Sequence, residues 1–252
     1  KAQIRELLST DVEWKPYASE WKFGFAGHGK YAIKFGEDQQ LELRGLIDRV
    51  DTVDIGEGET RFRILDYKTG NKKVSYARLY YGFDLQLPIY LSAFESLNQG
   101  YIANDAGYAY MGTHSFKDKQ YREYTEEEFL RKSDSNFKIS TIDLDEETLH
   151  LVMRHVEERA VEIANSILDG DFSVAPRTDS ANLDPLRFID YRALAQVDRG
   201  YIRVGYEPQL EGLARDIDPE ETAKVRGNGR NQKDKGHIKI ILEDKFGVED
   251  EQ

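Results

Sequence analysis

The alternation of apolar and polar residues predicts three strands in the first third of the chain. They cover residues 30–35, 41–53 and 61–69, where Leu, Ile and Val recur at alternate positions. Gly56-Glu57-Gly58 separates the last two and is typical of a turn. The pattern therefore predicts a β-hairpin that joins 41–53 to 61–69.

After the hairpin, the spacing of apolar residues becomes helical. We expect a mostly helical run over 75–97, interrupted by Pro88, because proline inside a helix removes a hydrogen bond. A short strand is expected at 107–111. A short helix begins at Thr125, with Glu128 completing a capping box.

The clearest helix is predicted at 145–168 and stops at Gly170. A second, shorter helix is expected at 184–197. Residues 224–239 are basic and interrupted by glycine, so we expect a flexible, solvated segment, with a DNA-binding tail or a subunit contact as alternatives. The apolar stripe of the first helix is Leu149, Val152, Val156, Ala160, Ile163 and Ile167. Strands before and between helices predict an α/β or α+β domain.

The amino-acid composition excludes several kinds of functional site. The chain has 252 residues and no cysteine, which excludes disulfides, thiolate zinc sites, cysteine nucleophiles and iron–sulfur clusters. No apolar stretch is long enough for a membrane span, and no signal peptide is recognisable. We therefore expect a cytoplasmic protein with no membrane partner.

The net charge of −12 argues at first against a nucleic-acid partner, because lysine and arginine drive phosphate binding. The distribution of charge weakens that argument. Basic residues gather beside the hairpin and in 224–239, while acidic residues fill helix starts and the C-terminus. A cation held by acidic residues would also reverse the local field.

The hairpin brings acidic residues together. With the turn centred on Glu57, Asp48 lies opposite Asp66, and Lys68 shares the face of Asp66. Facing carboxylates repel each other, and a divalent cation would compensate them; oxygen ligands suit Mg²⁺ or Mn²⁺. The alternative is that both are strand-end residues, paired with Arg49 and Lys68. Their position inside apolar strands favours function, since buried charge is costly.

Gln86 and Tyr90 form the next candidate. Spaced by four, they would share one helix face shortly after the hairpin. Gln86 could donate to a phosphate or an acidic ligand, and Tyr90 could add a hydroxyl or a stacking surface. Taken alone, they are better explained as a solvated residue and a core aromatic, and Pro88 could misalign them.

Three segments, GLIDRVD, LDYKTG and QLPIY, together resemble the RecB-type branch of the PD-(D/E)XK nuclease superfamily. The similarity covers about residues 16–198 and is greatest to the C-terminal nuclease domain of the B subunit of AddAB/RexAB helicase–nucleases. It implies an α/β fold whose mixed central sheet is flanked by helices. It divides the chain into a nuclease domain at 1–200 and a partly flexible extension at 201–252.

The resemblance also assigns roles. It implies that Asp48 and Asp66 bind Mg²⁺ together with the carbonyl of Tyr67, that Lys68 is the catalytic lysine, and that Gln86 and Tyr90 form the family's Q-x-x-x-Y motif. The implied activity is Mg²⁺-dependent hydrolysis of DNA phosphodiester bonds, with single-stranded DNA as substrate and an exonuclease mode. The implied partners are DNA and an AddA/RexA-type helicase subunit, in recombination and double-strand-break repair.

The chain departs from the family in two ways. The family's metal-binding histidine on an upstream helix is expected to lie before the first residue given. Leu186, Ile189 and Ala195 stand where many B subunits have cluster-binding cysteines, so no iron–sulfur cluster is expected.

Weaker candidates surround the acidic pair. Arg44, Arg49, Lys72 and Lys73 could hold DNA phosphates, although ordinary solvated charges explain each equally well. For the whole domain, the alternative to a nuclease is a catalytically silent scaffold that binds DNA or a helicase subunit. A glycosidase-like carboxylate pair ranks last, because it explains neither Lys68 nor Gln86.

Overall fold

A computed structural model describes most of the chain in two compact units. The first unit comprises Lys1–Val74 and Gln86–Leu149, and the second comprises Ser75–Leu85 and His150–Gln252. The described residues are 14–36, 38–56, 58–70, 72–110, 138–172, 177–178 and 205–247. Within them, no helix is long and apolar enough to cross a membrane.

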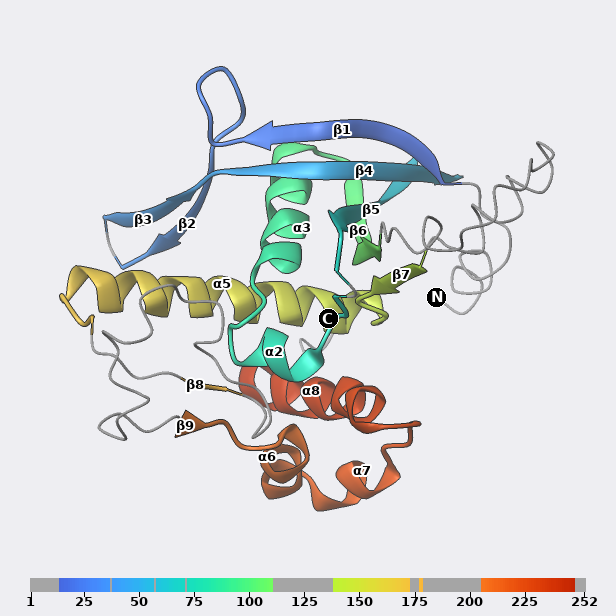
Figure 1. Cartoon of the computed structure of the whole chain (residues 1–252), viewed down its shortest axis with the longest axis vertical. Helices are drawn as coiled ribbons and strands as arrows, with labels where there is room; N and C mark the ends of the chain where they lie inside the picture. The colour runs from blue at the N-terminus through green and yellow to red at the C-terminus, as the bar shows by residue number, and fades with distance from the viewer. Residues whose placement is uncertain are drawn as a thin grey trace, which may run out of the picture. The chain divides into compact units, whose positions relative to one another are not determined.

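The first unit is built on a mixed five-stranded sheet in the order β1-β4-β5-β6-β7 (Figure 1). Its neighbouring strands are antiparallel except for β5 and β6, which are parallel. The strands are β1 (Lys15–Phe23), β4 (Gly45–Gly56), β5 (Glu59–Lys68), β6 (Tyr101–Tyr110) and β7 (Lys138–Thr141). The predicted α/β fold with a mixed sheet is confirmed.

The predicted hairpin is confirmed as β4 and β5, and its register is the expected one. Arg49 pairs with Leu65, and the same register continues to Asp54. Gly56 and Gly58 both have positive φ, a conformation that glycine adopts without steric cost. The predicted strand at 41–53 is divided at Arg44, because its first part belongs to a separate two-stranded sheet of β2 (Tyr31–Phe35) and β3 (Gln39–Leu43).

The helical run after the hairpin is divided earlier than expected. It forms α2 (Tyr76–Tyr80) and α3 (Gln86–Leu97), with the break before Gln86 and not at Pro88. Pro88 lies in the first turn of α3, where the missing N–H has no helical partner to lose. Helix α3 packs on β5 and β6, and the rings of Phe62 and Phe94 lie 4.6 Å apart.

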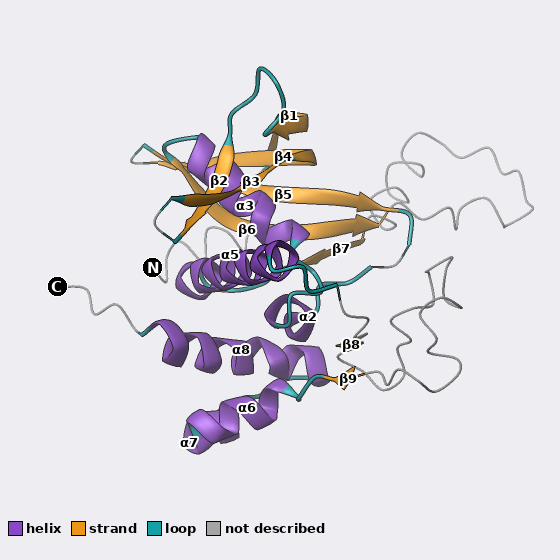
Figure 2. Cartoon of the chain, turned by 90° about the vertical axis from the view of Figure 1, so that its left-hand side faces the viewer, coloured by secondary structure: helices purple, strands orange, loops and turns teal. Residues whose placement is uncertain are grey.

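The second unit is mainly helical (Figure 2). Helix α5 (Glu146–Leu168) confirms the predicted helix, and all but its first turn belongs to this unit. The backbone N–H of Tyr76 donates to Asn231 Oδ1 over 3.1 Å, which ties α2 to α8. The other elements are β8 (Arg177–Thr178), β9 (Gly205–Tyr206), α6 (Leu210–Ile217), α7 (Pro219–Lys224) and α8 (Arg230–Phe246).

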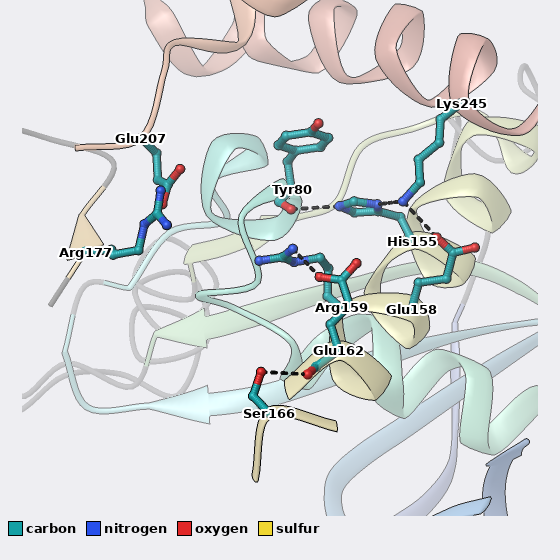
Figure 3. Close-up of polar contacts among 9 residues, drawn as sticks. All are labelled: Tyr80, His155, Glu158, Arg159, Glu162, Ser166, Arg177, Glu207 and Lys245. Atoms are coloured by element: carbon teal, nitrogen blue, oxygen red, sulfur yellow. Dashed lines mark hydrogen bonds and ion pairs between the residues drawn. The ribbon is translucent and has the colours of Figure 1, made fainter. Parts of the chain in front are cut away.

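A buried histidine joins three helices of this unit (Figure 3). The ammonium of Lys245 in α8 lies 3.1 Å from His155 Nδ1 and 2.7 Å from a carboxylate oxygen of Glu158. Because an ammonium can only donate, Nδ1 accepts and the proton sits on Nε2, which donates to the Tyr80 carbonyl over 2.7 Å. The Tyr80 ring stacks on the imidazole with the centroids 4.8 Å apart. Burial lowers the pKa of His155, so the ring is held neutral.

One expectation for this part of the chain is wrong. The basic segment at 224–239 is not flexible from Arg230 onward, because α8 begins there. Gly236 does not break that helix; a Cβ there would lie 2.9 Å from Val225, so glycine makes room for a close contact. At the end of α5, Ile163 and Ile167 are 42% and 54% exposed, so the apolar stripe is buried only in its first part.

Candidate active site

The hairpin brings Asp48 and Asp66 to the same face of the sheet. Regular pairing of β4 with β5 ends at Arg49 and Leu65, and the next positions in that register are Asp48 and Asp66. Asp48 Oδ2 accepts the backbone N–H of Tyr67 over 2.8 Å, so its side chain continues the hydrogen bonding where strand pairing stops. Asp66 is 3% exposed, whereas Asp48 is half-buried.

Lys68 reaches back to the buried carboxylate. Its ammonium nitrogen lies 2.5 Å from Asp66 Oδ2, and its side chain is 31% exposed. The contact is an ion pair without hydrogen-bond geometry, so Asp66 Oδ2 is a buried oxygen with no hydrogen bond. The ammonium therefore compensates a buried charge, while the Lys68 side chain as a whole stays partly exposed to solvent.

Helix α3 adds the third element of the site. Gln86 Nε2 donates to Asp66 Oδ1 over 3.0 Å and to the hydroxyl of Tyr90 over 3.2 Å. The two residues share a helix face as expected, because both lie in one continuous helix and their side chains are in contact. The two oxygens of Asp66 are thus divided, with Oδ1 facing Gln86 and Oδ2 facing Lys68.

The ring of Tyr90 is fixed by a glycine at the start of β4. A Cβ at Gly45 would lie 2.9 Å from Tyr90 Cε1 and 2.6 Å from the ring of Phe23. The Tyr90 and Phe23 rings meet edge to face with centroids 6.0 Å apart. Gly45 is therefore needed for close approach, and it sets the position of the hydroxyl that Gln86 contacts.

Tyr108 is a neighbour of the site that sequence reasoning missed. It pairs with Asp66 across the parallel strands β5 and β6 and is 3% exposed. The ammonium groups of Lys68 and Lys72 lie 5.8 Å and 4.3 Å from its ring centroid. The segment 107–111 was expected to be a strand, but its neighbour in the sheet could not be read from the sequence.

Comparison with known proteins identifies the family. The family model described as the PD-(D/E)XK nuclease superfamily matches residues 1–181, which is more than half of the chain. The chain belongs to the PD-(D/E)XK nuclease superfamily. The resemblance inferred from the three sequence motifs is therefore confirmed.

Curated relatives of this nuclease-superfamily chain are named as the B subunit of an ATP-dependent helicase/deoxyribonuclease. The protein from Clostridium tetani is 28% identical over 250 residues, which cover 78% of this chain and 21% of the relative. The protein from Clostridioides difficile is 27% identical, with 78% and 22% covered. A match to the Pediococcus pentosaceus protein is 38% identical over 95 residues, covering 36% of this chain and 8% of the relative. The chain spans about a fifth of the length of the first two relatives.

The weaker DNA-binding candidates of this nuclease-superfamily chain do not all lie at the site. Lys72 lies at the site, over Tyr108, and Lys73 is exposed in the loop after β5. Arg44 is exposed and lies 5.7 Å from the ring centroid of Phe25. A role for Arg44 or Lys73 in DNA binding stays a prediction.

Arg49 does not join the acidic pair. Side chains alternate along β4, so Arg49 and Asp51 lie on the face opposite Asp48. Arg49 Nε donates to Asp51 Oδ1 over 2.6 Å, and this hydrogen bond raises the pKa of Arg49. Asp51 is fully buried and also accepts from Arg63. Of the two ion pairs in the strand-end alternative, the one between Lys68 and Asp66 is present, whereas Arg49 pairs with Asp51.

The oxygen atoms on the site face fit a hard divalent cation. Mg²⁺ is commonly held by one or two carboxylates together with water and substrate phosphate. Asp48 and Asp66 supply two carboxylates, and Asp66 Oδ2 is buried without a hydrogen bond. Among the described residues, no group of three or more acidic, histidine or cysteine side chains could hold a metal ion by itself. The pair therefore suits a cation that completes its coordination with water and phosphate.

Some predicted positions lie outside the described residues. They are the helices expected from Thr125 and at 184–197, the cluster-related positions Leu186, Ile189 and Ala195, and the domain boundary expected at residue 200. The predicted role of the Tyr67 carbonyl as a metal ligand, and the division into 1–200 and 201–252, stay predictions.

Proposed function

We propose that this chain is the nuclease domain of a helicase–nuclease B subunit and hydrolyses phosphodiester bonds of DNA with Mg²⁺. The observation that carries the proposal is the position of Asp66, which Lys68 and Gln86 contact through different oxygens. Family membership and the names of the relatives support a deoxyribonuclease activity. Mn²⁺ could replace Mg²⁺, since both prefer oxygen ligands.

In the proposed site, Asp48 and Asp66 would hold the cation, with the Tyr67 carbonyl as a further ligand. A bound divalent cation supplies a more acidic water and neutralises charge on the phosphate. The backbone N–H of Tyr67 keeps one oxygen of Asp48 fixed. The carboxylate therefore has a defined orientation toward the site face.

Lys68 provides the mobile positive charge. Its ion pair with Asp66 keeps the ammonium beside the carboxylate, and its partial exposure lets it approach a substrate phosphate. There the ammonium would stabilise the extra negative charge that develops on the phosphoryl oxygens during attack by water. It would also hold a proton next to the attacking water.

Gln86 and Tyr90 would act on the orientation of Asp66. The Gln86 amide restrains Oδ1, and the Tyr90 hydroxyl restrains the amide. Groups behind a ligand fix its geometry, and their loss typically lowers metal affinity or activity about 10–100-fold. We therefore assign both residues to positioning.

The relatives' names suggest the setting of the reaction. We infer an AddA/RexA-type helicase partner that delivers single-stranded DNA to this domain in the cytoplasm, for exonucleolytic processing during recombination and double-strand-break repair. Delivery by a partner suits a chain of net charge −12, because less attraction of its own is needed. The basic side chains beside the hairpin would still contact phosphates locally.

The test is cleavage of end-labelled single- and double-stranded DNA by the purified chain, with and without Mg²⁺. We expect Mg²⁺-dependent cutting that Asp66→Asn and Lys68→Met each reduce at least 100-fold. Asp38→Asn, in an exposed turn, is the matched control and should cut normally. Cutting that persists in both site variants would overturn the assignment.

One observation favours a second function. The charges of the site already satisfy one another, since Lys68 neutralises Asp66 and Asp48 accepts an N–H. A silent scaffold that binds DNA or a helicase subunit would show the same contacts. DNA binding that is unchanged in Asp66→Asn, without cleavage under any metal and with the helicase partner present, would support the scaffold.

A further inference from the structure

Tyr108 lies beneath the basic side of the proposed site. It pairs with Asp66 in the parallel strands, so its side chain shares the face that carries Asp66 and Lys68. It is 3% exposed, so its ring is a fixed part of the sheet surface. Nothing in the three sequence motifs includes it.

Two ammonium groups converge on this one ring. The nitrogen of Lys72 lies 4.3 Å from the ring centroid and that of Lys68 lies 5.8 Å from it. Both distances are within the range of cation–π attraction, in which the negative face of the ring holds a cation. Both ammonium groups are therefore held near the same ring.

Two positive charges on one ring repel each other unless something compensates them. Asp66 compensates the charge of Lys68 through its ion pair, and the face of the Tyr108 ring attracts the ammonium of Lys72. Lys72 is half-buried, in the short segment that follows β5. The ring of Tyr108 thus holds two cations, Lys68 beside the carboxylates and Lys72 farther along. Two such cations suit two successive phosphates of a DNA strand.

We propose that Lys72 binds the phosphate adjoining the one that is cleaved, and that Tyr108 is the positioning residue that sets the place of both Lys72 and Lys68. This rests on the proposed nuclease function and defines a second phosphate subsite for it. The ligand is a DNA phosphodiester, and the subsite reads charge and not base identity. Its occupation would align the strand so that the next phosphate lies at Lys68.

The first experiment compares Lys72→Gln with Lys34→Gln, a matched change in an exposed residue of β2. We expect Lys72→Gln to raise KM for single-stranded DNA about 5- to 10-fold and to change kcat less than 2-fold. The slope of log KM against log salt should fall by about 0.7, the value for one phosphate contact on a single strand. An unchanged slope, or an equal effect of Lys34→Gln, would overturn the subsite.

A second experiment removes the charge from the substrate. Short oligonucleotides, each with one neutral methylphosphonate linkage, are cut by the unmodified protein and by Lys72→Gln. A methylphosphonate at one position next to the cleaved bond should raise KM 5- to 10-fold in the unmodified protein. The same substitution should have no effect in Lys72→Gln. Equal effects in both proteins at every position would show that Lys72 contacts no single phosphate.

A third experiment tests the ring. Tyr108→Phe keeps the aromatic face and should preserve the KM and the salt slope, whereas Tyr108→Leu should reproduce the KM defect of Lys72→Gln and also lower kcat through Lys68. Circular dichroism checks that Tyr108→Leu is folded. If Phe and Leu behave alike, the ring only fills space and the positioning role is wrong.

Failure of this inference can be told from failure of the proposed function. If the unmodified protein does not cut DNA, the function fails, and the subsite is then tested by anisotropy of labelled DNA in Ca²⁺. A salt slope that falls in Lys72→Gln but not in Lys34→Gln supports the phosphate contact. Equal slopes overturn it.

Discussion

The side-chain amide of Gln86 donates to Asp66 Oδ1 over 3.0 Å, and this single contact decides which oxygen of the carboxylate faces Lys68. The contact joins the first turn of α3 to the end of β5. Both oxygens of Asp66 thereby have a defined neighbour, so the orientation of the carboxylate depends on a residue outside the hairpin.

Replacement of Gln86 should therefore affect catalysis more than stability. We expect Gln86→Leu to lower kcat for DNA cleavage about 10- to 100-fold, because Asp66 loses its orienting donor. Tyr90→Phe should cost less, since Gln86 keeps its bond to Asp66. Steady-state kinetics at saturating Mg²⁺ measure both, and a larger defect in Tyr90→Phe would contradict this order.

The two acidic residues of the segment IDRVD should have separable roles. Asp51 is fully buried between the partly exposed Arg49 and Arg63, so Asp51→Asn removes the charge that both guanidinium groups contact and should cost about 1–3 kcal/mol of unfolding free energy. Asp48→Asn keeps an oxygen for the Tyr67 N–H and should cost little stability but abolish cleavage. Urea unfolding and the DNA assay, run on both variants, check this. Loss of stability in Asp48→Asn alone would reverse the assignment.

Gly45 should be intolerant of a single methyl group. A Cβ there would meet the rings of Phe23 and Tyr90 at 2.6 Å and 2.9 Å, so Gly45→Ala should cost about 1–3 kcal/mol and move the Tyr90 hydroxyl away from Gln86. Gly212→Ala is the control, because a Cβ there meets nothing within 4 Å and alanine favours the helix. Thermal unfolding should shift in opposite directions in the two variants, and only Gly45→Ala should cut DNA more slowly.

The site was predictable where short-range geometry determines it. A tight turn fixes the register of a hairpin, so the register that places Asp48 opposite Asp66 followed from the position of the glycines. Helical spacing likewise placed Gln86 and Tyr90 on one face. Tyr108 could not be predicted, because a parallel strand has no turn to set its register.

The fold was less predictable where packing outweighs local pattern. The glycine-interrupted segment 224–239 was expected to be flexible, yet Gly236 lies inside α8, where it accommodates Val225. Ile163 and Ile167 continue the apolar spacing of α5 but are exposed, since periodicity predicts a face and not what covers it. Arg49 was placed near the acidic pair by sequence proximity, but strand alternation turns it to the other face.

Because of Asp105, the first unit should be more stable at acidic than at neutral pH. Burial raises its pKa to about 6 from an ordinary 3.8; Arg63 opposes the rise, and Asp143 and Asp51 add to it. The folded state then holds the proton more tightly than the unfolded chain, so the unfolding free energy falls as pH rises from about 4 through 6. The loss is about 3 kcal/mol at most by pH 7. Asp105→Asn should remove this dependence in urea unfolding, and Asp38→Asn should retain it.

His155 should have the opposite effect in the second unit. Burial lowers its pKa, with Lys245 and Arg159 adding to the effect while the Tyr80 carbonyl and Glu158 oppose it. The unfolded chain then binds the proton more readily, so stability is lost as pH falls below about 6.5. His155→Gln can keep both hydrogen bonds without titrating. Hydrogen exchange of α5 and α8 at pH 7.5 and 5.5 should show the dependence in the unmodified protein only; equal dependence in both proteins would contradict the role of His155.

The order of the two units along the chain has a consequence for its synthesis. The first unit is complete in sequence at Leu149, whereas Ser75–Leu85 belongs with residues that follow His150. On the ribosome, Asp48, Asp66 and Gln86 can therefore meet before the last third of the protein has been made. The segment Ser75–Leu85 must wait for Asn231, the hydrogen-bond partner of Tyr76, to leave the exit tunnel. A nascent chain arrested after α5 would carry an assembled site, while Ser75–Leu85 would still lack its partner in α8.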